Sequence, residues 1–222
     1  PPGEKLVYDW YRRLSLLDRF LAELPTAAAM RDQEVHELGD FVGQPFGARV
    51  LEGGAPGSLR AMVHTERDGH LWWPDGGQQP LRVEKVVEVG AAPSVRVHYT
   101  WTNTGEHDLR AWWGVECNLK LLEDEGDDRR LHTPHDGASF PMDAFLDATA
   151  APTLEIQDDA LGFTAALAAD GDPRWVSFGV HTLSQSEAGV DRIYQGTCAV
   201  AFRHLELAPG ESVDATFELS IR

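Results

Sequence analysis

The sequence predicts a mainly β protein, a large antiparallel β-sandwich with one N-terminal α-helix. Apolar and polar residues alternate along many short stretches, and turn residues separate these stretches. Clear helical spacing occurs only at the start of the chain. Without helices between strands, parallel βαβ units are not expected, and roughly ten or more antiparallel strands form a sandwich instead.

An amphipathic helix is predicted over residues 8–21, since apolar residues recur there at helical spacing. Asp9 is a suitable N-cap, and Pro25 ends the pattern. A single apolar helix is not stable alone in water, so we expect it to dock on the sandwich or on an upstream domain. The residues expected to dock are Trp10, Leu14, Leu17 and Leu21.

Several turns and strands follow this segment. Asp68-Gly69 predicts a hairpin turn, and further turns are expected at residues 103–105 and 209–211. Residues 27–30 give a weak second helical signal. The main expected strands are residues 59–64, 81–89, 95–101, 111–122, 153–156, 162–168, 175–182, 198–202 and 213–221.

The chain divides into a lead-in over residues 1–32 and a single β-sandwich domain over residues 33–222. The lead-in contains no initiator Met, and we expect it to continue from an upstream domain missing from this chain. Long loops are expected at residues 42–57, 123–130 and 133–151, which are rich in turn-forming or acidic residues. Binding residues often lie on such loops.

Composition excludes several classes of function. The net charge of −17 argues against a nucleic-acid partner or an anionic membrane, because phosphates are repelled. No apolar run approaches the roughly 18 residues of a membrane-spanning helix. Cys117 and Cys198 lie in expected strands, and a chain of this size needs no disulfide. Two buried thiols and a cytoplasmic location are therefore predicted.

Metal and cofactor signals are weak. The acidic segment 123–128 lacks the ligand spacing of an EF-hand and is interpreted as a solvated hairpin tip. His132, His135 and Asp136 lie close together, but Pro134 prevents a helix that would align the two histidines. We therefore predict no metal and no cofactor.

One strand, residues 112–119, carries a polar face. Alternation places Trp112, Glu116 and Asn118 on one side, while Trp113 and Cys117 take the core side. An aromatic ring beside carboxylate and amide groups suits a sugar, which stacks on the ring and bonds through hydroxyls. The pattern is equally typical of the outward face of an ordinary antiparallel strand.

Six segments of the chain carry motifs that are informative in combination: Tyr8–Arg13, Ser15–Phe20, Glu37–Val42, Gly114–Leu119, Ser186–Gly189 and Tyr194–Gly196. In this order they resemble the C-terminal β-sandwich of family 57 glycoside hydrolases, the α-amylase and 4-α-glucanotransferase type enzymes. The resemblance spans nearly the whole chain. One position departs from the pattern, because Arg19 stands where a His is expected after the Asp.

The resemblance implies a supersandwich fold similar to galactose mutarotase. It also implies that the catalytic carboxylates belong to an upstream barrel, so this chain is a non-catalytic accessory domain that braces the barrel. Contact with α-glucan is a further expectation. The candidate carbohydrate-binding residues are Trp72, Trp73, Trp112, Glu116, Asn118, His181, Glu187 and Gln195.

Two alternatives remain open. An aldose epimerase-like enzyme of the same fold would need an acid and a base, for which Glu116, Glu187 and His181 are the candidates. A purely structural interaction domain would bind its upstream partner and no sugar.

Overall fold

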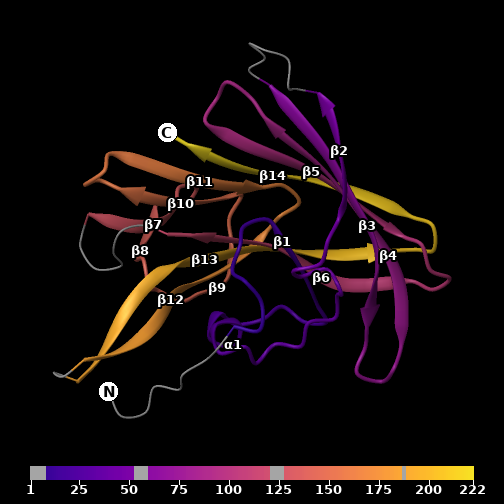
Figure 1. The fold of residues 1–222 in the computed structure, drawn as a ribbon, viewed down its shortest axis with the longest axis horizontal. Helices are drawn as coiled ribbons and strands as arrows, with labels where there is room; N and C mark the ends of the chain where they lie inside the picture. The colour runs from indigo at the N-terminus through magenta and orange to yellow at the C-terminus, as the bar shows by residue number, and fades with distance from the viewer. Residues whose placement is uncertain (1–8, 53–59, 121–127, 187–188) are drawn as a thin grey trace.

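The computed structural model describes residues 9–52, 60–120, 128–186 and 189–222, and nearly all of its regular structure is β-strand (Figure 1). One short helix, α1, spans Ala27–Arg31. The strands are β1 (Leu17–Leu21), β2 (Gly47–Glu52), β3 (Ala61–Trp72), β4 (Gln78–Val89), β5 (Ser94–Asn103), β6 (Leu109–Leu119), β7 (Arg129–Thr133), β8 (Ala138–Pro141), β9 (Leu146–Ala150), β10 (Thr153–Asp158), β11 (Phe163–Ala169), β12 (Arg174–Ser186), β13 (Gly189–Leu207) and β14 (Ser212–Ile221).

These strands form two antiparallel sheets, which confirms the predicted β-sandwich. The small sheet has five strands in the order β1-β6-β13-β12-β9. The large sheet has nine strands in the order β2-β3-β4-β5-β14-β11-β10-β7-β8. The main core lies between them and includes Tyr99, Trp101 and Trp113, with the Trp101 and Trp113 ring centroids 4.3 Å apart.

The predicted N-terminal helix is wrong. Its last part is the strand β1, which pairs with β6, and described residues 9–16 form no helix. Phe20 faces the main core, whereas Arg19 contacts Glu116 on the outer side of the small sheet. The backbone pairing and the burial of both faces favour a strand over the helical spacing of the same leucines. The one helix, α1, begins after Thr26, whose hydroxyl accepts a hydrogen bond from the Ala29 amide at 3.2 Å.

The loss of this helix changes the predicted docking residues. Trp10 and Leu14 are 59% and 49% exposed and lie on a segment that is not helical. Leu21 is buried in a second core, on the outer side of the small sheet. Leu17 is half-buried. The second core joins α1 to the small sheet, through Ala27, Met30, Val176, Phe178, Cys198, Val200 and Phe202.

The small sheet is therefore buried on both faces, so the polar side of β6 is not exposed to solvent. Trp113, Val115 and Cys117 face the main core as predicted. The opposite side is covered by the segment that precedes β1 and by α1, so Glu116 is fully buried. Both thiols are free and buried, as expected, and burial raises the pKa of Cys117 to about 11.

The predicted hairpin turn at Asp68-Gly69 is also wrong. Strand β3 continues to Trp72, and the turn lies at residues 73–77. Gly69 pairs with Leu81 inside the strand. A Cβ at this position would collide with the Asp40 carboxylate and would lie 2.6 Å from Cζ of Phe41. A glycine in a sequence can therefore mark a close packing contact inside a strand as well as a turn.

Replacing Gly69 by alanine is expected to lower the free energy of unfolding by about 1–3 kcal/mol, because the new methyl group overpacks the core at Phe41. Urea denaturation of both proteins measures this change. Gly90→Ala is the matched control, since a Cβ at Gly90 has nothing within 4 Å. Equal stability of the Gly69→Ala protein and the wild type would contradict the packing argument.

Other expectations are met in part. The turns at residues 103–105 and 209–211 are present, and β4, β5 and β14 match the predicted strands. The expected loop 42–57 contains β2, and the expected loop 133–151 contains β8 and β9. Most of the acidic segment lies outside the described residues. None of the described helices is long and apolar enough to cross a membrane.

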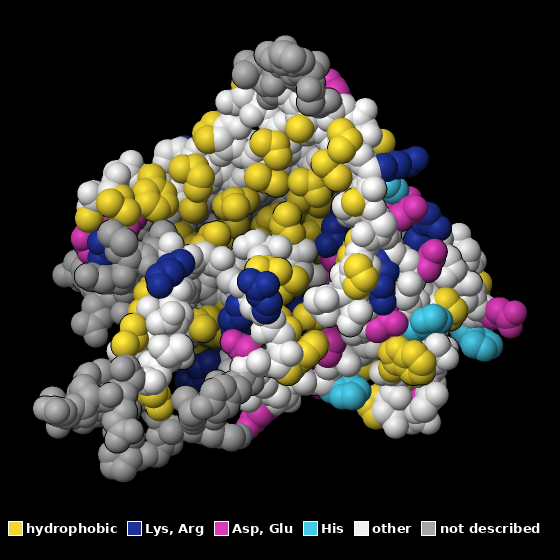
Figure 2. Space-filling model, in the orientation of Figure 1, with side chains coloured by type: hydrophobic (Ala, Val, Ile, Leu, Met, Phe, Trp, Pro, Cys, Tyr) yellow, Lys and Arg dark blue, Asp and Glu magenta, His cyan; other side chains and the backbone are white. Residues whose placement is uncertain are grey.

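The large sheet extends beyond the small sheet and leaves part of its inner face uncovered. Figure 2 shows hydrophobic side chains gathered in a hollow over this part of the molecule. Register places them on the face that elsewhere forms the main core. We call this surface the apolar face; it comprises Val50, Val63, Val87, Val89, Val95, Leu219 and Ile221, all partly or largely exposed.

Candidate functional site

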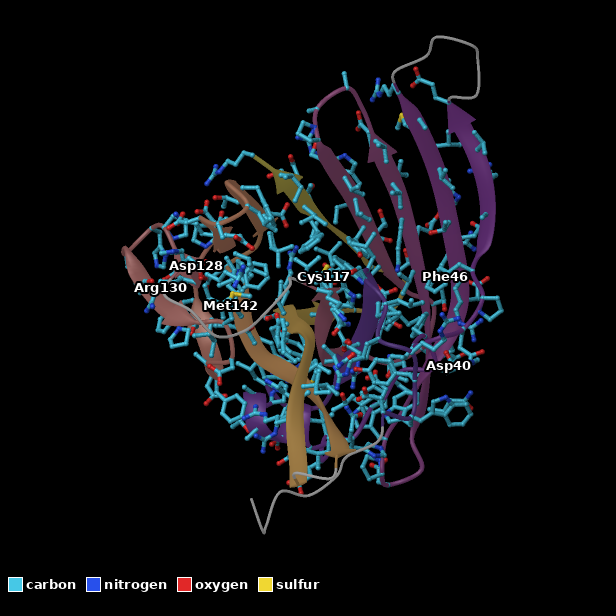
Figure 3. The ribbon with its side chains drawn as sticks, turned by 60° about the vertical axis from the view of Figure 1, so that its left-hand side comes forward. Asp40, Phe46, Cys117, Asp128, Arg130 and Met142 are labelled. Atoms are coloured by element: carbon cyan, nitrogen blue, oxygen red, sulfur yellow. The ribbon has the colours of Figure 1, made fainter. Side chains whose placement is uncertain are left out.

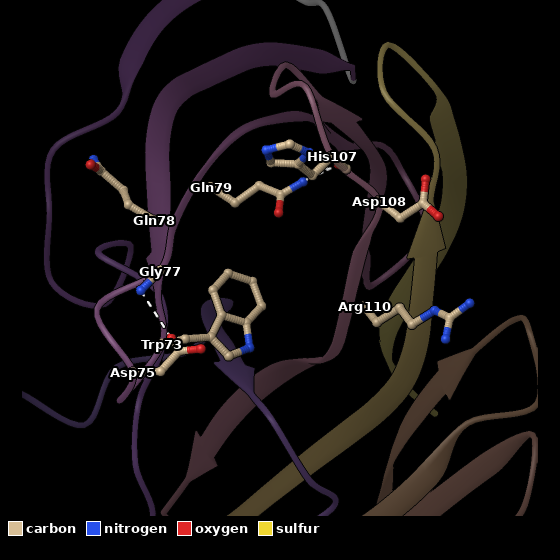
Figure 4. Close-up of a pocket in the computed structure, with 8 residues that line it drawn as sticks. All are labelled: Trp73, Asp75, Gly77, Gln78, Gln79, His107, Asp108 and Arg110. Carbon is tan, nitrogen blue, oxygen red and sulfur yellow. Dashed lines mark hydrogen bonds between the residues drawn. The ribbon is translucent and has the colours of Figure 1, made fainter.

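A hollow with a volume of about 370 Å³ lies where the β3–β4 turn meets the β5–β6 loop (Figure 4). In the β3–β4 turn, the Trp73 amide donates to the Gly77 carbonyl at 2.8 Å, and the Gly76 amide donates to the Trp73 carbonyl at 2.9 Å. The Gly77 amide donates to Oδ1 of Asp75 at 2.9 Å. This bonding fixes the backbone that carries the Trp73 ring. The lining residues are Trp73, Asp75, Gly77, Gln78, Gln79, His107, Asp108 and Arg110.

Asn103, which is fully buried, fixes the other side of the hollow. Its amide nitrogen donates to the carbonyls of His107 at 2.8 Å and Leu207 at 3.0 Å. Its Oδ1 accepts from the Gly105 amide at 3.0 Å. The Asn103 side chain therefore holds the loop that carries His107 and Asp108 to the sheet. A buried amide with its bonds satisfied gives a loop a single conformation.

Gln79 lies between the two turns. Its amide nitrogen donates to the His107 carbonyl, so the amide is oriented. Figure 4 shows its carbonyl oxygen and the Trp73 ring facing the same hollow, whereas Gln78 points away. Asp108 and Arg110 are exposed on the opposite rim. The Arg110 guanidinium forms an ion pair with Glu206 at 2.7 Å.

Glu116 lies in a different place, inside a buried ionic cluster on the outer side of the small sheet. It accepts hydrogen bonds from the Tyr11 hydroxyl at 2.8 Å, from Nη1 of Arg19 at 2.8 Å and from Nδ2 of Asn118 at 2.8 Å. Burial, and then the Glu116 charge, raise the pKa of Tyr11, so its hydroxyl stays protonated and donates. Both carboxylate oxygens are occupied by protein donors. Glu116 is therefore not accessible to a ligand in this structure.

Arg19 connects this cluster to a second carboxylate. Its Nε donates to Oε2 of Glu37 at 2.6 Å, and Oε1 of Glu37 accepts from the Phe20 amide at 2.6 Å. Burial raises the pKa of Glu37, and the Arg19 charge opposes that shift. A fixed guanidinium between two carboxylates balances charge inside the protein, which is a structural role.

Comparison with known proteins identifies the family. The family described as "Alpha-amylase/4-alpha-glucanotransferase, C-terminal" matches residues 3–216. The chain belongs to this family. A curated relative, 4-alpha-glucanotransferase of Thermococcus litoralis, is 30% identical over 195 residues, which cover 86% of this chain and 24% of the relative. The chain thus spans about a quarter of the length of this relative.

Solved structures give the same result. The crystal structure of 4-alpha-glucanotransferase from Thermococcus litoralis aligns with a TM-score of 0.73 and 27% identity, over 97% of this chain and 28% of that one. A galactose mutarotase-like protein from Clostridium acetobutylicum aligns with a TM-score of 0.56 and 10% identity, over 96% of this chain and 77% of that one. The second likeness concerns the fold alone and confirms the predicted supersandwich.

Within this C-terminal domain, the predicted carbohydrate-binding residues do not form one site. Trp73 lines the hollow, and Trp72, at the end of β3, is 48% exposed with its ring 5.7 Å from the His70 ring. Trp112 is half-buried and packs edge-on against His204. Asn118 donates to Glu116 and to the Leu14 carbonyl at 2.7 Å.

The remaining predicted residues belong to the hairpin of β12 and β13. Gln195 donates to the Thr182 hydroxyl at 3.1 Å, and Nδ1 of His181 lies 2.9 Å from Nη2 of Arg192. On β13, Gln195 lies eleven positions before Glu206, the partner of Arg110, which corresponds to about 36 Å of strand. This hairpin is therefore remote from the Trp73 hollow. Glu187 lies outside the described residues.

Two groups were missed by sequence reasoning. Asp75, Gln79, Asp108 and Arg110 join Trp73 only through tertiary structure; the one local signal was their position beside turns. His64, Glu66 and Glu84 also converge, on neighbouring strands. In that second group the Arg82 guanidinium contacts Glu66 and lies 3.5 Å from Glu84, so the carboxylates already have a cation.

Proposed function

We propose that this domain is a non-catalytic accessory domain of an α-glucan-processing enzyme of the α-amylase or 4-α-glucanotransferase type. The burial of Glu116 carries the proposal, because it removes the candidate acid or base that the epimerase hypothesis takes from β6. The family membership and the larger size of the relative support it. The catalytic carboxylates then belong to an upstream domain, as the resemblance to family 57 implies.

The domain braces that catalytic domain through the apolar face rather than through a helix at Trp10. Val50, Val89 and Ile221 are 70%, 43% and 40% exposed and lie on the same face of the large sheet. A contiguous apolar surface of this kind is typical of a protein interface. The polypeptide that precedes the matched region in the relatives is the proposed cover.

The same proposal includes contact with the α-glucan on which the enzyme acts, and a cytoplasmic location. Two free, buried thiols suit a reducing compartment. Contact with a glucan requires accessible side chains. The buried Glu116 cluster is therefore excluded, and the candidates are the surface groups around the two turns at the Trp73 hollow.

Hydroxyl-radical footprinting tests the bracing role. The isolated chain is compared with the full-length polypeptide that contains it. We expect Val89 and Ile221 to react several-fold less in the full-length protein, because the upstream domain covers them. Leu161, which is 54% exposed and lies outside the apolar face, is the matched control and should react equally in both.

Equal reactivity of Val89 and Ile221 in the two proteins would overturn the bracing role. The accessory role has its own measurement: the full-length protein is expected to transfer or hydrolyse maltooligosaccharides, whereas the isolated chain is inactive. Activity of the isolated chain on glucan, or mutarotation of glucose faster than in buffer, would overturn it.

A further inference from the structure

The ring of Trp73 is a fixed, partly uncovered plane. Part of the side chain packs against the main core, and the rest lines the hollow. Its backbone is held by the bonds of the β3–β4 turn. An indole held in this way loses little side-chain freedom when a ligand stacks on it. The C–H face of a sugar ring is a suitable partner for such a plane.

Gln79 supplies an oriented acceptor beside this plane. The side chain is only 9% exposed, and its nitrogen is bonded to the His107 carbonyl. Among the described residues no donor reaches its carbonyl oxygen, which points into the hollow in Figure 4. A ligand hydroxyl at that position would donate to it without displacing a protein bond.

The rim of the hollow adds both hydrogen-bond donors and hydrogen-bond acceptors. The Asp75 and Asp108 carboxylates accept hydrogen bonds, and the Arg110 guanidinium donates them. Two acidic groups and a net charge of −17 disfavour an anionic ligand such as a phosphate. A neutral ligand that both donates and accepts through many hydroxyls fits this set. The volume of about 370 Å³ is near the small end of known ligand sites, which span roughly 300–1,000 Å³.

We infer that the Trp73 hollow is a carbohydrate subsite that binds one or two glucose units of an α-glucan, with the sugar ring stacked on Trp73 and a hydroxyl bonded to Gln79. The carbohydrate class follows from the lining groups, and the choice of α-glucan rests on the proposed function. The subsite lies on turns that project from the ends of four strands, where it can hold a chain that continues into solvent.

Calorimetric titration of the chain with maltopentaose tests this inference. We expect weak binding, in the millimolar range, and about tenfold or greater weakening in Trp73→Ala. Asp108→Ala replaces an exposed rim residue and should weaken binding about twofold to tenfold without unfolding the domain. Trp10→Ala is the matched control, since Trp10 is an exposed Trp that is not part of the lining, and it should bind like the wild type.

Near-ultraviolet circular dichroism verifies that each variant is folded. If Trp73→Ala does not fold, the binding affinity of Asp108→Ala decides the test. Wild-type affinity in a folded Trp73→Ala or in Asp108→Ala, or no binding by the wild type, would overturn the subsite. Equal binding of cellopentaose would overturn its assignment to α-glucan. These failures leave the bracing role intact, because the footprinting of Val89 and Ile221 involves no sugar.

Discussion

Replacing Glu116 by alanine is expected to lower the free energy of unfolding by about 3–5 kcal/mol. The carboxylate accepts from Tyr11, Arg19 and Asn118 and is fully buried. Without it, Glu37 is the one anionic partner left to the Arg19 guanidinium among the residues that the structure describes, and the Tyr11 hydroxyl loses its acceptor. A buried group left without its partner costs far more than the net value of the original bond.

Urea denaturation monitored by fluorescence measures this loss. Glu206→Ala is the matched control, because Glu206 also pairs with an arginine but is 59% exposed at its side chain, so the change should stay within about 1 kcal/mol. If the two variants were equally stable, the cluster would contribute no more than a surface ion pair. Such a result would also reopen the question of whether Glu116 has a role in binding.

Replacing Lys85 by methionine is expected to destabilise the domain by a similar amount, about 3–5 kcal/mol. The Lys85 ammonium pairs with the Asp18 carboxylate and donates to the Leu16 carbonyl at 3.0 Å. Asp18 also accepts from the Trp113 indole at 3.1 Å and is only 2% exposed. The substitution keeps the volume of the side chain and leaves Asp18 as an uncompensated buried charge.

A double-mutant cycle separates this charge effect from packing. Asp18→Asn keeps an acceptor for Trp113, and in the Lys85→Met background it removes the unpaired charge. The double variant is therefore expected to be more stable than Lys85→Met alone, with a coupling of about 0.5–3 kcal/mol. Simple additivity of the two single changes in denaturation experiments would show that the pair does not link β1 to β4 energetically.

The sequence was sufficient for the fold class but not for the N-terminal segment. The strands β4, β5 and β14 show plain alternation, because one face of each meets the main core. In β1 the same leucines satisfy both a helical and a strand period, and local pattern cannot choose between them. Pairing with β6, about 95 residues later in the chain, decides the outcome. Gly69 led to a wrong turn prediction for a related reason, because its small size is needed for packing against Phe41, a distant residue in the sequence.

The candidate site was predictable only in its aromatic component. Trp73 was a candidate because a sugar can stack on an aromatic ring, whereas Gln79 and Asp108 are ordinary polar residues until the two turns meet. Glu116 and Asn118 had the composition of a sugar-binding face, yet the covering segment at Tyr11 turns that face into an interior. The number of layers over a sheet is a tertiary property and is not encoded in the alternation of one strand.

The position of β14 constrains the order in which this domain assembles. Although it is the last strand in chain order, it lies between β5 and β11 in the large sheet (Figure 3 shows the strands from a second side). The two halves of that sheet therefore have no hydrogen-bonded connection until residues 212–221 have left the ribosome. Folding of the large sheet is therefore dominated by long-range pairing and should be slow. Until β14 pairs, β5 and β11 each present an unpaired edge, and such edges promote aggregation.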